Sequence, residues 1–144
     1  MALEEVKTQA RLVDGLTVDI QARDHVVRID EPKAAGGADE GMTPVEALLG
    51  SLGSCKVIVD QLLAESCEIK LTDVSIEHVG EIDPDGLAGT NPEAKIGFSK
   101  ITTIYDINAD NTQEEIEKFI EIIESTCPVR DTIVNAPEWA VQTK

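Results

Sequence analysis

The sequence predicts an α+β fold in which an antiparallel sheet packs on two main helices. Five short segments are interpreted as strands, three of which (16–22, 72–82 and 98–107) alternate apolar and polar residues as half-buried strands do. Two longer segments repeat apolar residues every three or four positions, as helices do. Their order, βββ-α-ββ-α, is typical of antiparallel α+β folds. At 144 residues the chain is expected to form a single domain, residues 1–144, whose core needs neither disulfides nor metal.

Three strands are expected at the N-terminus. Residues 6–12 and 16–22 are predicted to pair through a turn at 13–15, and residues 26–29 to follow a second turn at 23–25. The next stretch, 32–42, carries one proline and three glycines with few apolar residues. It is expected to be a long loop of the kind that often carries function.

The first main helix is expected to begin at Thr43-Pro44-Val45-Glu46. Thr43 suits the N-cap, Pro44 suits the first helical position, and Glu46 can complete a capping box. A broad apolar stripe follows, to about residue 66: Val45, Leu48, Leu52, Cys55, Val59 and Leu62. Its width predicts a central helix that is covered on more than one side.

Two further strands and a second helix are expected in the rest of the chain. Residues 72–82 and 98–107 alternate like strands and are separated by turn-forming residues at 83–92. A second capping box, Thr112 to Glu115, opens a helix that ends at Cys127, because Pro128 disfavours the helical conformation in the residue before it. The tail is expected to add a short helix and an edge strand.

Charge and composition exclude several classes of partner. Acidic residues outnumber basic ones 28 to 12, for a net charge of −16. Such a field repels phosphate backbones and anionic lipids, so neither nucleic acid nor a membrane is an expected partner. No apolar run approaches a membrane span and the N-terminus lacks a signal-peptide pattern, so a cytoplasmic location is expected.

Two cysteines lie on the two apolar faces. Cys55 is in the middle of the first stripe and Cys127 is at the end of the second. Because both faces must be buried in a small domain, the two thiols are expected to be near neighbours. Inert packing of buried cysteines stays open as an alternative. Pro128 also predicts a new helical turn after Cys127, whose free N–H groups would stabilise a thiolate.

The remaining metal-ligating residue types carry no clear signal. The three cysteines form no CxxC pair and the two histidines complete no zinc spacing. Cys67 lies among acidic residues near a helix end and is interpreted as structural or incidental. His25 and His78 are expected to be solvated.

Three segments form a recognisable set: Gly36-Gly37, then Gly41-Met42-Thr43-Pro44-Val45-Glu46-Ala47-Leu48-Leu49 through Cys55, and Cys127-Pro128-Val129. With them, the chain resembles the OsmC/Ohr family over about residues 6–142. The resemblance implies an intertwined homodimer with buried central helices and active sites at the subunit interface. It also implies a thiol peroxidase without metal or bound cofactor that reduces organic hydroperoxides. By position, Cys55 matches the peroxidatic cysteine and Cys127 the resolving one, and an external dithiol resets their disulfide.

The resemblance further implies that an arginine from the N-terminal strands stabilises the thiolate, paired with a glutamate at the start of the central helix. Arg23 is the first candidate and Arg11 the second; Arg28 and Arg130 are the other arginines of the chain.

The glutamate departs from the family pattern. In the hydroperoxide resistance branch it directly follows the proline, a position that Val45 occupies here, and the acid is Glu46. Glu46 lies about half a helical circumference from Cys55, so it is not expected to face the Cys55 of its own chain. Capping and catalysis both stay open for it. The alternative function is a non-catalytic module of the same fold that binds a small ligand or senses redox state.

Overall fold

The computed structural model describes residues 2–144, and the predicted α+β class is confirmed within them. The chain divides into two compact units, one ending at Leu48 and the other comprising Leu49–Lys144. The strands form two antiparallel sheets rather than one, with three strands in the first unit and two in the second.

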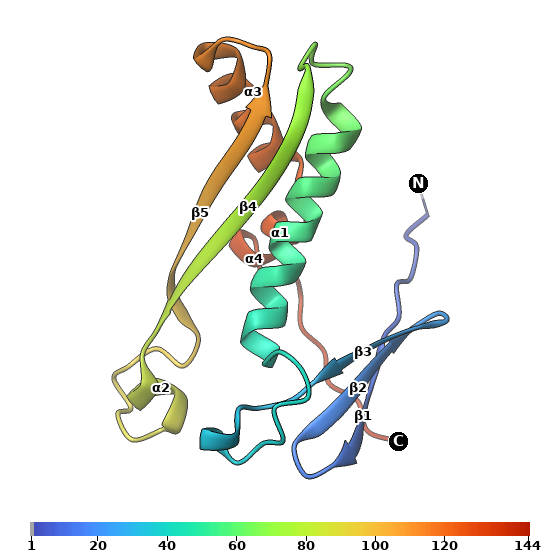
Figure 1. The fold of residues 1–144 in the computed structure, drawn as a ribbon. Helices are drawn as coiled ribbons and strands as arrows, with labels where there is room; N and C mark the ends of the chain where they lie inside the picture. Colours follow the sequence, from blue (N-terminus) through green and yellow to red (C-terminus); the bar gives the residue numbers. More distant parts are fainter. Residues whose placement is uncertain (1) are drawn as a thin grey trace. The chain divides into compact units, whose positions relative to one another are not determined.

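The first unit contains the three predicted strands in the order β1-β2-β3: β1 (Gln9–Asp14), β2 (Thr17–Ala22) and β3 (His25–Ile29) (Figure 1). The first turn lies at residues 15–16 and not at the predicted 13–15. The reason is that Gly15 adopts a φ of +51°, the left-handed conformation that two-residue hairpin turns require. The second turn begins at Arg23, as predicted.

The loop predicted after β3 is confirmed and contains one short 3-10 helix, η1 (Lys33–Ala35). Buried Asp30 organises this loop by accepting hydrogen bonds from Thr17 Oγ1 at 2.9 Å and from the Glu31 N–H at 2.8 Å. Burial by itself would raise the pKa of Asp30, but the hydrogen bonds outweigh it and lower that pKa. At Gly37 a Cβ atom would collide with the carbonyl oxygen of Glu31, which explains the glycine.

Helix α1 (Pro44–Leu63) begins where the capping box predicts. The Thr43 N–H donates to Glu46 Oε2 at 2.8 Å, and the Glu46 N–H donates to Thr43 Oγ1 at 3.3 Å. The two bonds satisfy N–H groups that have no partner inside the helix. The predicted capping role of Glu46 is therefore confirmed.

The second unit is built on a long hairpin of β4 (Leu71–Ile82) and β5 (Phe98–Ala109), alongside which α1 runs (Figure 1). It continues with α3 (Gln113–Thr126) and α4 (Pro128–Val134). The capping box at Thr112 and Glu115 is confirmed, and so is the end of α3 before Pro128.

Two local predictions in this unit are wrong. The stretch 83–92 is not wholly a loop, because Asp83 accepts hydrogen bonds from the N–H groups of Asp85 and Gly86 and so initiates the short helix α2 (Pro84–Ala88). After Val134, residues 135–144 contain no strand, so the predicted edge strand does not form in this chain. The short helix predicted for the tail is α4.

The core of the second unit lies between α1, α3 and one face of the hairpin. Its buried residues come from α1, from the segment that follows it and from α3: Val59, Ala64, Ile69, Phe119 and Ile123. Side chains on the inner face of the strands, such as Tyr105 and Ile107, pack against them. Burial of Phe119 or Ile123 contributes roughly 2 kcal/mol each. This packing places the middle of α1 against the end of α3.

On another side of α1, two apolar residues are exposed in the part of the chain that the structure describes. Ile58 is 59 % exposed and Leu62 is 72 % exposed. The prediction of a helix covered on more than one side is therefore not met by a single copy. No helix within residues 2–144 is both long enough and apolar enough to cross a membrane.

Candidate functional site

Cys55 and Cys127 meet in the second unit, so their predicted proximity is confirmed. Cys55 is on α1, and Cys127 lies between α3 and α4. Their Sγ atoms are 3.2 Å apart, and neither is in a disulfide. Cys127 is buried and Cys55 is half-buried. Because a disulfide needs an S–S distance of about 2.0 Å, the two sulfurs have to approach by only about 1 Å to bond.

Pro128 determines the position of Cys127. It ends α3 and starts α4, which leaves Cys127 extended at φ −71° and ψ 111°, as the N-cap of α4. In this position Cys127 Sγ accepts a hydrogen bond from the N–H of Arg130 at 3.4 Å. The backbone N–H of Val129 acts on Cys55 by lowering the pKa of its thiol. The helical turn predicted after Cys127 is thus confirmed, and its N–H groups serve both thiols.

The environment of Cys55 acts on its ionisation in opposite directions. Burial raises the pKa of the Cys55 thiol, whereas the N–H of Val129 lowers it. The hydrogen bond with Cys127 raises the pKa further, and the positive charge of Lys56 opposes that rise. The net result is a raised pKa, so the thiolate needs additional positive charge, as expected for a buried cysteine.

A charged network that the sequence reading missed lies beside the thiols. Lys56 is 1 % exposed, and its Nζ donates to Glu124 Oε1 at 2.6 Å and to Thr103 Oγ1 at 2.9 Å. Glu124 Oε1 also accepts from the hydroxyl of Tyr105, and Glu124 Oε2 accepts from Arg130 Nε at 2.8 Å. One carboxylate therefore joins two cations from two different helices.

The network perturbs its own members in the expected directions. Burial by itself would raise the pKa of Glu124, but hydrogen bonds from Lys56 and Tyr105 outweigh it and lower that pKa. Burial raises the pKa of Tyr105, and its bond to the Glu124 carboxylate raises it further. Glu124 is therefore held as a carboxylate and Tyr105 as a neutral hydroxyl.

The sequence did contain a signal for this network. Lys56 occupies a helical position between Leu52 and Val59 on the predicted apolar stripe, and Asp60 lies one turn further on the same helix. Lysine and aspartate are almost never fully buried unless they are paired. Charged residues within a stripe that must be buried would have indicated an internal partner.

A cavity of about 260 Å³ is lined by residues of the charged network and by neither thiol. Its polar wall consists of the network residues Lys56, Thr103, Glu124 and Arg130, and its apolar wall of Leu52, Ile101, Ile133 and Val134. A cavity with one apolar and one polar wall suits a small organic molecule that carries a polar end.

Three of the four candidate arginines lie in the first unit. Arg23 is exposed in the β2–β3 turn with a φ of +53°. Arg28 is held by two hydrogen bonds to Asp19, at 2.8 and 3.0 Å, and by Glu40 at 3.0 Å. Arg130 shares the second unit with the two thiols.

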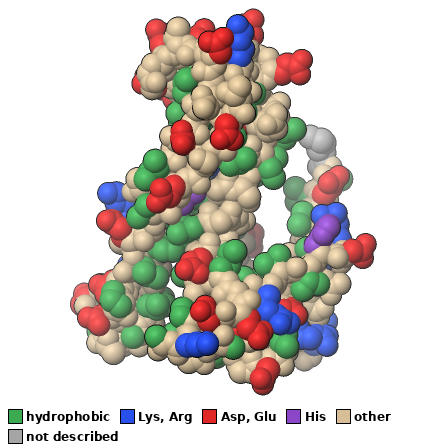
Figure 2. Space-filling view, in the orientation of Figure 1, with side chains coloured by type: hydrophobic (Ala, Val, Ile, Leu, Met, Phe, Trp, Pro, Cys, Tyr) green, Lys and Arg blue, Asp and Glu red, His purple; other side chains and the backbone are tan. Residues whose placement is uncertain are grey.

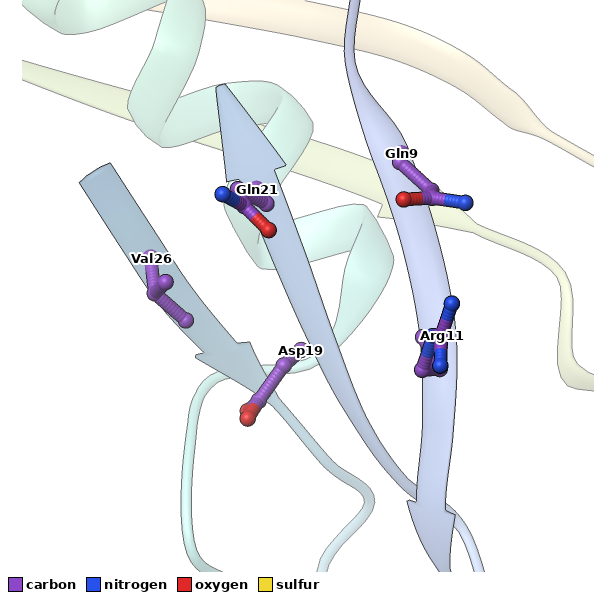
Figure 3. A pocket seen from close by; sticks show the side chains of 5 residues that line it. All are labelled: Gln9, Arg11, Asp19, Gln21 and Val26. Carbon is purple, nitrogen blue, oxygen red and sulfur yellow. The ribbon is translucent and has the colours of Figure 1, made fainter. Parts of the chain in front are cut away.

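Arg11 lies on one face of the three-stranded sheet (Figure 3). It lines a pocket of about 320 Å³ with Gln9, Asp19, Gln21 and Val26. Arg11 and Asp19 are cross-strand partners, but the carboxylate of Asp19 is bonded to Arg28. The catalytic roles of Arg23, Arg11 and Glu46 stay predictions.

The other cysteine and the histidines are placed as follows. Cys67 is half-buried against the core, and His25 is exposed at the start of β3, as expected. The expectation for His78 is wrong, because its ring faces Gly53 of α1 and its Nε2 is buried without a hydrogen-bond partner within residues 2–144. Burial lowers the pKa of His78, and the charge of Lys56 lowers it further. Residues 2–144 contain no cluster of three or more His, Cys, Asp or Glu placed to hold a metal ion.

The family model described as OsmC-like protein matches residues 36–142. A hydroperoxide reductase of Mycoplasma pneumoniae is 26 % identical to this chain over 95 residues, which are 65 % of this chain and 63 % of that protein. The match thus spans less than two thirds of the relative's length. A hydroperoxide reductase of Mycoplasma genitalium matches with the same identity and coverage.

Solved structures share the fold. The OsmC like protein from Mycoplasma pneumoniae has a TM-score of 0.80 at 22 % identity, over 92 % of this chain and 89 % of that one. An organic hydroperoxide resistance protein OsmC from Legionella pneumophila has a TM-score of 0.66 at 20 % identity, over 94 % of this chain and 93 % of that one. At these identities the likeness shows a common fold.

Proposed function

Because this chain belongs to the OsmC-like protein family, we propose that it reduces organic hydroperoxides, with Cys55 as the attacking thiol and Cys127 as the resolving thiol. The observation that carries the proposal is the 3.2 Å separation of the two sulfur atoms. The charged network next to them in the sequence also lines a cavity that has apolar residues. The names of the two Mycoplasma hydroperoxide reductases support the same chemistry.

The reaction has two oxidative steps in the site. The Cys55 thiolate attacks the terminal oxygen of the hydroperoxide; the O–O bond breaks, an S–O bond forms, and the alkoxide takes up a proton and leaves as an alcohol. Cys55 is then a sulfenic acid, oxidised by two electrons. The Cys127 sulfur attacks Cys55, the S–O bond breaks, and water leaves as the disulfide forms. An external dithiol reduces this disulfide by exchange and is itself oxidised to a disulfide.

The cavity supports an organic substrate in preference to hydrogen peroxide. Leu52, Ile101, Ile133 and Val134 form an apolar wall that would contact the alkyl part of a hydroperoxide. Burial of each methylene group contributes about 0.8 kcal/mol, which hydrogen peroxide cannot gain. Resetting by a dithiol requires a reducing compartment, for which we propose the cytoplasm.

The experiment that tests this function is oxidation of the reduced protein with one equivalent of tert-butyl hydroperoxide. After free thiols are blocked, peptide mass spectrometry is expected to find an intramolecular Cys55–Cys127 disulfide and a Cys67 that carries the blocking group, with one equivalent of tert-butanol released. Dithiothreitol is expected to restore both thiols and allow another cycle. Peroxide that is not consumed, or a protein that never links these two cysteines, would contradict the proposal.

The raised pKa of Cys55 favours one alternative, a redox sensor of the same fold. A thiol that is mostly protonated at neutral pH reacts slowly, so oxidation would take place without sustained turnover. The two functions differ in the reset: a sensor forms the disulfide but is recycled slowly by dithiothreitol, whereas the peroxidase completes many cycles. In a small-ligand-binding module, treatment with the peroxide would form no Cys55–Cys127 disulfide.

Arg23 and Glu46 remain part of the proposed catalytic set on the strength of the family resemblance. In the proposed homodimer a partner copy supplies Glu46, since this residue is not expected to face the Cys55 of its own chain.

The exposed face of α1 supports the proposed homodimer. Ile58 and Leu62 lie one turn apart on the same side of the helix, and both are largely exposed. In a twofold dimer such a face meets its own copy, so each apolar residue is buried twice.

We expect Leu62→Glu to dissociate this dimer, weakening association at least about a hundredfold, because two charges would enter an apolar interface. Light scattering after size-exclusion chromatography measures the mass at micromolar concentration. Gln61→Glu adds the same charge at the neighbouring exposed position and is the matched control. A wild-type protein that is monomeric at these concentrations, or a Leu62→Glu variant that stays dimeric, would overturn the homodimer.

A further inference from the structure

The residues of the charged network are close neighbours of the two cysteines in the sequence. Lys56 directly follows Cys55 on α1. Glu124 lies one helical turn before Cys127, and Arg130 lies one turn after it, with its N–H bonded to Cys127 Sγ. The Glu124 carboxylate connects the two cations, at 2.6 Å from Lys56 Nζ and 2.8 Å from Arg130 Nε.

We propose that Glu124 is the positioning residue of the thiol pair: by bonding Lys56 of α1 and Arg130 of α4, it holds the turn that carries Cys127 against Cys55. Lys56 supplies positive charge to the Cys55 thiolate, a role separate from the positioning by Glu124. This inference rests on the proposed peroxidase function, because it assigns the residues that make disulfide closure fast.

Stability alone does not account for this network. Lys56 is 1 % exposed on an otherwise apolar stripe. Removing two charges from water costs about as much as their attraction returns, so apolar residues of the same size would stabilise the core as well or better. What a buried pair provides is a defined geometry, because only one arrangement satisfies both charges. That geometry fixes the part of the chain where Cys127 must meet Cys55.

The local charge also suits a thiolate. Two cations share one carboxylate, whereas the chain as a whole is strongly acidic, with red acidic side chains spread over the face in Figure 2. Ionisation of one thiol would balance the surplus positive charge. Asp60 adds a negative charge above its raised pKa of about 6, and at neutral pH this charge offsets part of the surplus. The charged and titratable groups that act on Cys55 are Cys127 and Lys56. Those that act on one another around this pair are Asp60 of α1, His78 of β4, Tyr105 of β5, Glu124 of α3 and Arg130 of α4.

The test separates positioning from reactivity by measuring two rates. Closure is the rate at which the Cys55–Cys127 disulfide appears after tert-butyl hydroperoxide is added, with the chain in its full length. Reactivity is the rate of alkylation of Cys55 by iodoacetamide between pH 6 and 10, in a background where Cys127 and Cys67 are serine. Glu124→Gln removes the carboxylate but keeps its shape, and Glu121→Gln, at an exposed position one turn earlier on α3, is the matched control.

We expect Glu124→Gln to slow closure about tenfold without slowing alkylation of Cys55. The carboxylate that joins Lys56 to Arg130 is lost, whereas the positive charge of Lys56 remains. Lys56→Met is expected to slow alkylation about tenfold at pH 7 by raising the pKa of Cys55 by one unit. Arg130→Gln removes only the outer contact of a half-exposed side chain, so it keeps the fold and slows closure to a smaller extent, about threefold.

Closure as fast in Glu124→Gln and Arg130→Gln as in the Glu121→Gln control would overturn the positioning role. An equal loss of both rates in Glu124→Gln would also overturn it, since it would indicate general loss of structure. If the wild-type protein does not react with the peroxide at all, the proposed function fails; the alkylation profiles still report whether Lys56 acts on Cys55.

Discussion

Replacing Cys55 by serine is expected to abolish the reduction of tert-butyl hydroperoxide, lowering its rate by about a thousandfold or more. The hydroxyl of serine is not an effective nucleophile toward peroxide oxygen, and no other thiol takes its place. Cys127 is buried, and Cys67 is half-buried against the core and forms no contact with Cys55 or Cys127 among the hydrogen bonds of residues 2–144. The loss is measured as peroxide consumed over time in the presence of dithiothreitol.

Two further variants make this result specific. Cys67→Ser is the matched control, because it removes a free cysteine that the mechanism does not use, and its rate should equal that of the wild type. Without dithiothreitol, Cys127→Ser should reduce two equivalents of peroxide and then stop. The first equivalent forms Cys55 sulfenic acid, and the second oxidises it to sulfinic acid because no resolving thiol is present. Mass spectrometry detects that product. Undiminished peroxide consumption by Cys55→Ser would rule out the mechanism.

Replacing Asp60 by asparagine is expected to stabilise the protein at pH 8 and to have about half that effect at pH 5. Asp60 is fully buried, and neither carboxylate oxygen has a hydrogen-bond partner within residues 2–144. Burial raises its pKa from 3.8 to about 6. Asparagine has nearly the same shape and never carries the charge that burial disfavours.

The direction in which the stability changes with pH follows from the number of protons that the folded and unfolded states bind. The folded protein keeps the Asp60 proton up to about pH 6, whereas the unfolded chain releases it near pH 4. Between these values the folded state binds more protons, so the contribution of Asp60 to stability falls as the pH rises. The full difference amounts to about 3 kcal/mol in the free energy of unfolding.

Urea denaturation of both proteins at pH 5 and pH 8 measures this effect as the change in their difference in stability. Asp73→Asn, at an exposed position on β4, is the matched control and is expected to have little effect at either pH. A difference between wild type and Asp60→Asn that is the same at both pH values would show that Asp60 is not held in the protonated form by burial.

The sequence was sufficient where a structure depends on a few neighbouring residues. The capping boxes at Thr43 and Thr112 form as predicted, because the threonine at the N-cap and the glutamate three positions later lie within one helical turn. Pro128 likewise ends one helix and begins the next. The facing of Cys55 and Cys127 could also be predicted, since two apolar faces in a small chain have few other surfaces on which to be buried.

The predicted element boundaries were wrong where the backbone conformation or the capping side chain of a single residue decided the structure. The turn after β1 moved to Gly15, which accepts the left-handed conformation at little cost. Asp83 capped a short helix in a stretch read as a loop. Periodicity does not register such choices, because each depends on one residue and its own backbone.

The sequence by itself determined the order of the elements, their caps and the two apolar faces that carry the thiols. Only the tertiary structure decided which charges surround those thiols. Lys56, Thr103, Glu124 and Arg130 lie on four different elements, and each reads as an ordinary polar residue in its own segment. Their pairing depends on distances across the core, and those distances are set by the packing of whole helices on the β4–β5 hairpin rather than by neighbours along the chain.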